Sequence, residues 1–186
     1  FEGGRNRSTV KAYLEFGDRI AAAIEKNPAK PEPVLIHKGF KWDASDNSIK
    51  TTTTYTCFPM LSLPEVVERL KSFYGAEERK PFILVKSFLS IAATRTDPRM
   101  FLYFEAMDPD SRRNSFDINL YRSNLKLGEL YPMLLQVCWH YGIPYRELNR
   151  VYDPMKQHVF GHLTGGRDRD GKDFLTVYFA GHGTSR

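Results

Sequence analysis

The chain has 186 residues, of which 41% are hydrophobic and 26% are charged. This composition is close to the average of soluble domains, and it excludes a collagen-like chain, a coiled coil and a disordered tail. No apolar run approaches the roughly 20 residues that a membrane-spanning helix needs, and the first residues lack the apolar segment of a signal peptide. We therefore expect a single domain over residues 1–186, with no membrane segment and a cytoplasmic location.

Basic residues exceed acidic ones by 27 to 22, which gives a net charge of +5. The excess is spread along the chain, whereas nucleic-acid-binding proteins usually gather it in a stripe or an arm. Nucleic acid is therefore an unfavoured partner, and a basic pocket for a carboxylate or phosphate accounts for the charge at least as well. The two cysteines, Cys57 and Cys138, belong to no Cys/His cluster. We expect buried thiols, no metal and no other cofactor.

The first predicted element is a helix that Ser8 caps and that ends at Asn27, because apolar residues between them recur at helical spacing. Residues 34–42 and 50–58 then predict two strands, separated by a polar turn. The second strand is rich in threonine, which favours extended backbone. The sequence therefore begins with a helix and a β-hairpin.

A second helix is predicted to begin at Ser62, where Ser62 and Glu65 have the spacing of a capping box. Three strands follow, over residues 82–94, 99–107 and 115–122. Polar turn residues separate these strands, which predicts that each lies antiparallel to the next.

The last third of the chain predicts two helices, over residues 127–141 and 146–152, and a closing hairpin of residues 157–163 and 174–180. Because hairpins dominate this order, we expect an α+β fold, with a mostly antiparallel curved sheet of about seven strands and helices packed on one face. The glycines within 161–166 close a hairpin and open no helix, so they do not form a dinucleotide-binding fingerprint.

Alternation along these strands places aromatic rings and a few polar groups on the same faces. We interpret the mixed faces as the lining of a cavity for an aromatic or prenyl-like ligand. The alternative is a second apolar core or a dimer interface. The residues expected to line the cavity and bind the substrate are Phe101, Tyr103, Asn119, Tyr121, His158, His162 and Tyr178.

Glu105 is the candidate catalytic residue, because it is the sole carboxylate in the apolar strand 99–107. Partial desolvation would suit it to act as a general acid and base. Lys86 interrupts another apolar segment, and an isolated cation there needs an anion. Lys86 or Arg95 is therefore expected to hold a substrate carboxylate. The alternative is an ion pair, of Lys86 with Glu105 or Asp117, or of Arg95 with Glu105.

His158 and His162 share a strand face, but they are four residues apart. That spacing separates them by about 13 Å, which is too far for two ligands of one metal ion. We therefore expect no zinc site, and either histidine remains a candidate acid, base or hydrogen-bond donor.

Residues 79–107 carry basic side chains at Arg79, Lys80 and Arg95 ahead of a glutamate in an aromatic strand. This arrangement resembles the small bacterial Pictet–Spengler enzymes that form β-carbolines of the marinacarboline type. The resemblance implies that a tryptophan- or indole-type amine condenses with an aldehyde and that a glutamate, here Glu105, is the acid and base. Arg95 stands where the family has an upstream imidazole.

The segments Lys86–Phe88 and Asn119–Arg122 also resemble those with which αββα-barrel aromatic prenyltransferases hold a diphosphate. Such barrels need more strands than this chain predicts, so a dimer would have to complete one. We expect a cofactor-free enzyme of specialised metabolism that forms a homodimer and acts on a small aromatic substrate. The non-enzymatic alternative is a basic, β-rich binding module for an acidic partner or nucleic acid.

Overall fold

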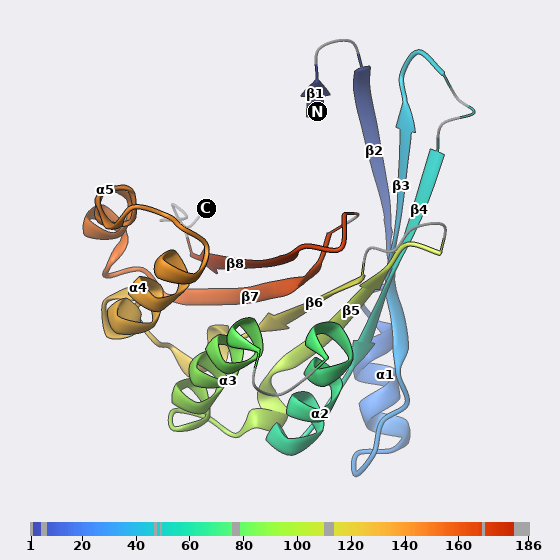
Figure 1. Cartoon of the computed structure of the whole chain (residues 1–186). Coiled ribbons are helices and arrows are strands. Elements are labelled where there is room, and N and C mark those ends of the chain that lie inside the picture. Colours follow the sequence, from blue (N-terminus) through green and yellow to red (C-terminus); the bar gives the residue numbers. More distant parts are fainter. Residues whose placement is uncertain are drawn as a thin grey trace, which may run out of the picture.

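The computed structural model describes residues 2–4, 7–46, 48, 50–75, 79–109, 114–168 and 170–180, with side chains from residue 9 onward in these ranges. Within them, eight strands form one antiparallel sheet in which each strand pairs with the next along the chain (Figure 1). The sheet curls into a half-barrel accompanied by helices. The predicted α+β class and curved antiparallel sheet are confirmed.

The N-terminal part of the sheet contains strands β1 (Glu2–Gly4), β2 (Arg7–Glu15), β3 (Val34–Asp43) and β4 (Lys50–Phe58), with helix α1 (Arg19–Lys26) between β2 and β3. The strands β2, β3 and β4 extend upward in Figure 1, beyond the helices and beyond β5–β8. We call this extension the arm.

The predicted helix over residues 8–27 is wrong in its first half, because residues 7–15 form β2. This strand pairs with β3 from Thr9 opposite Asp43 to Glu15 opposite His37. Pairing along β3 satisfies the backbone groups of β2 and overrides the weak helical spacing of its apolar residues. The cap expected at Ser8 lies outside the described side chains.

The central and C-terminal elements are α2 (Leu63–Tyr74), α3 (Lys80–Ala93), β5 (Leu102–Met107), β6 (Asn114–Asn119), α4 (Tyr131–His140), α5 (Tyr145–Met155), β7 (Phe160–Arg167) and β8 (Asp173–Phe179). The start of α2 follows the prediction, since the Glu65 carboxylate accepts hydrogen bonds from the Ser62 amide at 2.8 Å and from its hydroxyl at 2.5 Å. None of the helices in the described part of the chain is long and apolar enough to cross a membrane.

The predicted strand over residues 82–94 is wrong, because this segment is helix α3. Its buried residues Phe82, Val85 and Leu89 recur at helical spacing, and Pro81 stands in the first turn, where a helix tolerates proline. A continuous apolar run is compatible with a buried strand or a buried helix, and the length of the run favours the helix. As a result, Lys86 is an exposed helical residue.

The main core lies between one face of β5–β8 and the helices α2, α3 and α4, the first two of which lie below β7 and β8 in Figure 1. Tyr103, Phe116 and Leu163 contribute to it from the sheet, and Leu70 and Phe88 contribute from the helices. We call this side of the sheet the core face. The opposite side of β5–β8 is called the open face, and by strand register it carries Phe104, Asp117, Asn119, His162, Thr164 and Tyr178.

A bulge in β7 sets the direction of His162. The register with β8 shifts between Phe160 and His162, so Phe160 is buried in the core while His162 lies on the open face. The strict alternation along residues 157–163, from which His158 and His162 were expected to share a face, therefore does not hold. Gly161 lies at the bulge, and a Cβ atom there would be only 2.5 Å from the ring of Tyr121, so glycine lets this ring approach the strand.

Candidate active site

The sheet separates the predicted site residues into two groups. Tyr103 and Glu105 lie on the core face, where Glu105 pairs in register with Phe116. Phe101 is also buried in the core, 1% exposed. Asn119, His162 and Tyr178 lie at opposed register positions on the open face. A single cavity that contains both Glu105 and His162 is therefore excluded by the position of the backbone between them.

Glu105 is held by residues of the core face. Its carboxylate accepts a hydrogen bond from Arg69 Nε at 2.9 Å and another from the Tyr103 hydroxyl at 3.2 Å. The Arg69 guanidinium stacks 3.5 Å from the centre of the Phe58 ring. Burial, followed by the nearby Glu105, raises the pKa of Tyr103 well above its ordinary value. Tyr103 is therefore a neutral donor to the carboxylate.

Arg69, rather than Lys86 or Arg95, is thus the cation beside Glu105. Lys86 lies on α3 with its Nζ 5.4 Å from the centre of the Phe82 ring, and Arg95 forms an ion pair with Glu129. Arg69 and Phe58 also line a pocket of about 350 Å³, and Glu105 is not among its lining residues. The catalytic role of Glu105 and the carboxylate-binding roles of Lys86 and Arg95 stay predictions.

On the open face, Asp117 and His162 form a carboxylate–imidazole pair. His162 Nδ1 lies 2.6 Å from Asp117 Oδ1, and Thr164 Oγ1 donates to Asp117 Oδ2 at 2.5 Å. The side chains of His162 and Asp117 are 28% and 31% exposed, so a ligand has access to the pair. A carboxylate bound to one ring nitrogen fixes the tautomer and orientation of an imidazole and leaves the other nitrogen, Nε2, for acid–base chemistry.

Two tyrosines flank this histidine. The ring of Tyr121 meets the imidazole edge-to-face with centres 5.3 Å apart, and the ring of Tyr178 does so at 6.3 Å. Both tyrosines are exposed. Asn119 Oδ1 accepts a hydrogen bond from the Tyr121 amide at 3.2 Å. The open face thus brings together four of the predicted lining residues, and it combines an oriented imidazole with flat apolar surfaces.

Sequence reasoning missed Asp117 and Thr164 in this site. Alternation on residues 115–122 does place Asp117 on the same side as Asn119. Alternation within one strand, however, does not identify which residues of the neighbouring strand lie opposite. The partners follow only from the register, in which Asp117 is opposite Thr164 and Asn119 is opposite His162.

His158 does not join the site. It is 8% exposed, its Nδ1 is hydrogen-bonded to the Ala180 carbonyl, and its ring lies against Phe179. These contacts give His158 a structural position at the end of the hairpin. In the part of the chain that the structure describes, no group of three or more histidine, cysteine or acidic side chains has the arrangement of a metal site.

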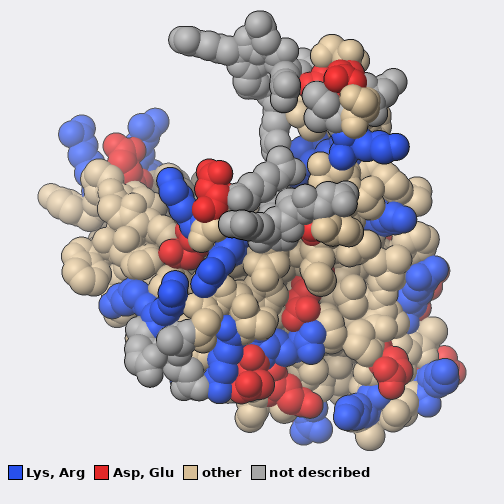
Figure 2. All heavy atoms as spheres, turned by 45° about the vertical axis from the view of Figure 1, so that its right-hand side comes forward, with Lys and Arg blue, Asp and Glu red and all other residues tan. Residues whose placement is uncertain are grey.

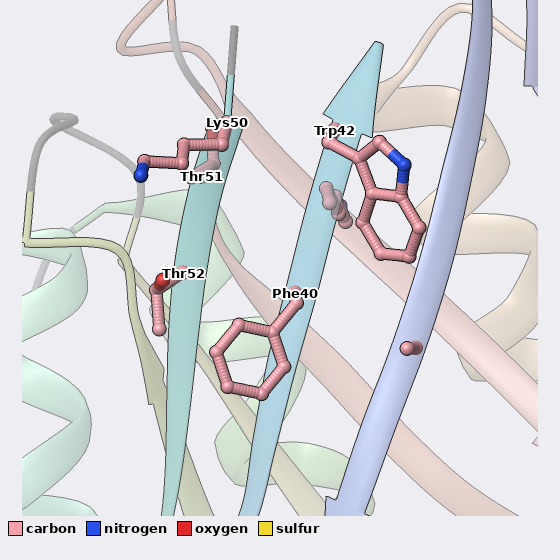
Figure 3. Close-up of a pocket in the computed structure, with 7 residues that line it drawn as sticks. Phe40, Trp42, Lys50, Thr51 and Thr52 are labelled. Atoms are coloured by element: carbon pink, nitrogen blue, oxygen red, sulfur yellow. The ribbon is translucent and has the colours of Figure 1, made fainter. Parts of the chain in front are cut away.

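A second hollow lies on the arm. Figure 3 shows Phe40 and Trp42 side by side on β3, with Lys50 and Thr52 on the neighbouring β4. The hollow has a volume of about 420 Å³. Its walls combine the two rings with Ala12, two lysines and two threonines, so it would accept a flat group that carries polar or anionic substituents.

Comparison of the chain with models of protein families, with curated proteins and with solved structures gives no match.

Proposed function

We propose that the chain is an enzyme that binds a small aromatic substrate against the open face and transfers a proton through His162. The observation that carries this proposal is the pairing of His162 with Asp117 between two exposed tyrosines. An imidazole fixed at one nitrogen by a carboxylate accepts a proton at the other, and the carboxylate stabilises the resulting imidazolium.

The reaction proposed is a Pictet–Spengler cyclisation, for which the sequence resemblance is the support. An aromatic amine and an aldehyde condense to an imine with loss of water. The indole carbon of the protonated imine then attacks the imine carbon and forms the new carbon–carbon bond. Loss of the proton from the indole carbon that made the attack restores the aromatic ring, and His162 Nε2 is the acceptor of this proton. The protein contributes orientation and acid–base catalysis.

The two aromatic neighbours of His162 give the substrate its place in this proposal. Tyr121 and Tyr178 offer ring faces beside the imidazole, against which an indole can stack. Such an aromatic contact stabilises the bound indole by about 0.5–1.5 kcal/mol in addition to the free energy of burying it. Glu105 serves the same reaction as base only if the substrate binds on the core face. The two assignments are therefore separable by mutation.

The test is product formation from tryptophan or tryptamine with a panel of aldehydes, followed by mass spectrometry. We expect His162→Gln to lower turnover by about 100-fold or more, while Glu105→Gln retains turnover within a few-fold. Circular dichroism of both variants controls for folding. The reverse order of the two effects would move the base to Glu105. A wild-type protein that forms no cyclised product would contradict the reaction itself.

We further propose that the enzyme acts in the cytoplasm as a homodimer. Several large apolar side chains are exposed, among them Tyr13, Leu14, Tyr121 and Tyr178. A second copy of the chain would cover part of this surface and would add walls to the substrate site.

A second candidate function is the binding of single-stranded nucleic acid or an acidic partner through the arm. The observation that favours it is the pair of rings at Phe40 and Trp42 with Lys50 across the strand, because bases stack on such rings beside cations. Against it, Figure 2 shows basic side chains interspersed with acidic ones on the face turned forward there. Binding to an oligonucleotide that falls steeply with salt and with Trp42→Leu would favour this function.

A further inference from the structure

A basic pocket lies on the helix-covered side of the sheet, away from the open face. Four elements form it: the end of α2, the start of α3, the end of α4 and the β7–β8 hairpin. The pocket has a volume of about 300 Å³, and its polar and charged lining residues are Tyr74, Arg79, Lys80, His140, Arg167 and Asp173.

The pocket holds more positive charge than its own residues neutralise. Its carboxylate, Asp173, lies 3.2 Å from His140 Nε2. The Nε of Arg167 donates to the Phe73 carbonyl at 3.1 Å, which leaves the two terminal nitrogens of the guanidinium for other acceptors. The Nζ of Lys80 lies 5.1 Å from the centre of the Trp139 ring. Among the described residues, no carboxylate forms an ion pair with Arg79, Lys80 or Arg167.

The start of α3 adds a second source of positive potential. The residue at its N-cap position is Arg79, which has no side-chain acceptor for the first amides, and no acidic residue occupies the first turn. The unpaired amides and the helix dipole of this 14-residue helix favour an anion at that end.

A buried hydroxyl that donates no hydrogen bond is the independent sign of a ligand. Tyr74 is 1% exposed, and its hydroxyl has no acceptor among the described residues, while the Gly166 amide acts on its oxygen as a donor. A buried hydroxyl in this state costs about 1–3 kcal/mol. Burial, followed by the nearby Asp173, raises the pKa of Tyr74. The hydroxyl therefore stays protonated and can donate to an acceptor in the pocket.

We propose that this pocket binds the phosphate or diphosphate group of a small organic ligand. A dianionic phosphate has enough oxygens to accept from Arg167, Lys80, the Tyr74 hydroxyl and the first amides of α3 together, whereas one carboxylate carries a single charge. The volume exceeds what phosphate alone fills, so an organic part fits beside it. Trp139, which is 77% exposed next to Lys80, offers that part a flat apolar surface.

The test is isothermal titration calorimetry of the full chain with pyrophosphate, inorganic phosphate and citrate at low ionic strength. We expect pyrophosphate to bind with a Kd below about 1 mM, phosphate to bind more weakly and citrate more weakly still. Lys80→Met and Arg167→Met each weaken pyrophosphate about tenfold or more. Arg146→Met, which removes an exposed arginine on α5, is the charge-matched control and leaves the affinity unchanged.

Tyr74→Phe keeps the proposal testable if a cation variant fails to fold. It removes only the hydroxyl that donates no hydrogen bond, so the ligand-free melting temperature is unchanged or higher while pyrophosphate affinity falls about three- to tenfold. Absence of pyrophosphate binding by the wild type would overturn the proposal. Wild-type affinity in Lys80→Met and Tyr74→Phe would also overturn it, and equal affinity for citrate would overturn the assignment to phosphate.

Discussion

His162 Nδ1 lies 2.6 Å from Asp117 Oδ1, and the two residues come from neighbouring strands, β7 and β6. Thr164 Oγ1 donates to the second oxygen of the same carboxylate, so both oxygens have a partner and the carboxylate cannot turn away from the imidazole. Asp117 is therefore a positioning residue for His162. Its negative charge also stabilises the imidazole when it carries a proton at both nitrogens.

Asp117→Asn tests this role. The amide oxygen still accepts from His162 Nδ1, but the charge that stabilises the imidazolium is gone. We expect kcat to fall about 10- to 100-fold with little change in KM. Thr164→Val, which removes one donor to the carboxylate, should lower kcat less than tenfold. NMR of the ring nitrogens would show whether the tautomer of His162 changes. A rise in KM with unchanged kcat would mean that Asp117 only shapes the binding surface.

The contact between Arg69 and Glu105 predicts coupled stability effects. Their side chains are 33% and 16% exposed, and Arg69 Nε lies 2.9 Å from the carboxylate. Loss of either partner leaves a half-buried charge, so each of Arg69→Met and Glu105→Gln should lower the free energy of unfolding by about 1–2 kcal/mol. Urea unfolding of both variants and of the double variant checks this. The double variant should lose less than the sum, and additive losses would show that the two side chains do not interact.

The strand pairs were predictable because polar turns and β-branched residues mark them locally, as in residues 34–42 and 50–58. The start of α2 was predictable for a similar reason, since Ser62 and Glu65 form a local capping box. By contrast, α3 was missed because Phe82–Leu89 is apolar on nearly all sides, and periodicity then does not separate a buried helix from a buried strand. β2 was missed because its pairing with β3 is a non-local interaction.

In the candidate site, too, local patterns predicted the face of a residue but not its partners on other strands. The alternation on residues 115–122 correctly separated Phe116 and Ile118 from Asp117 and Asn119, as their burial shows. The bulge between Phe160 and His162 moved His162 to the face opposite Phe160, and one inserted residue is enough to reverse every later assignment. Bulges and cross-strand partners depend on neighbouring strands, so the Asp117–His162 pair emerges only from the assembled sheet.

Gly165→Ala should destabilise the sheet strongly. A Cβ atom at Gly165 would lie 2.5 Å from the Tyr74 hydroxyl, 2.8 Å from the Phe116 ring and 3.0 Å from the Phe174 carbonyl. Because these atoms belong to the packed core and to backbone, we expect a loss of about 2–3 kcal/mol. Gly17→Ala is the matched control, since nothing lies within 4 Å of its Cβ position, and it should change stability by less than about 0.5 kcal/mol. Equal melting temperatures of the two variants would contradict this packing.

The proposed homodimer is checked by light scattering. The expected mass is twice 21.5 kDa at micromolar concentration. If the partner covers the aromatic hollow of the arm, Trp42→Glu should shift the mass to that of one chain, because it removes the largest apolar surface of the hollow and burial of a carboxylate opposes association. Tyr145→Glu, at a residue of α5 that is 72% exposed, is the control that should leave the dimer intact. A single-chain mass for the wild type would exclude a stable dimer.

The two thiols should be unreactive in the folded protein. Cys57 is fully buried and Cys138 is 6% exposed, and neither forms a disulfide. Burial raises the pKa of Cys57 from its ordinary 9.0 to about 12, and it raises the pKa of Cys138 as well. Since the thiolate is the reactive form, iodoacetamide at pH 8 should modify both cysteines in guanidinium chloride and neither in buffer. Rapid alkylation of the native chain would contradict the burial.

The raised pKa of Cys57 also predicts how the stability of the fold depends on pH. The unfolded chain ionises Cys57 above pH 9, whereas the folded chain keeps it protonated until about pH 12. The free energy of unfolding therefore does not vary with the ionisation of Cys57 below pH 9. As the pH rises from 9 towards 12, ionisation of Cys57 in the unfolded chain lowers the free energy of unfolding by up to about 1.4 kcal/mol per pH unit. Urea unfolding of the wild type and of Cys57→Ala between pH 8 and pH 10 measures this loss. Cys57→Ala should lose less stability over that range, and identical slopes would show that the Cys57 thiol does not contribute.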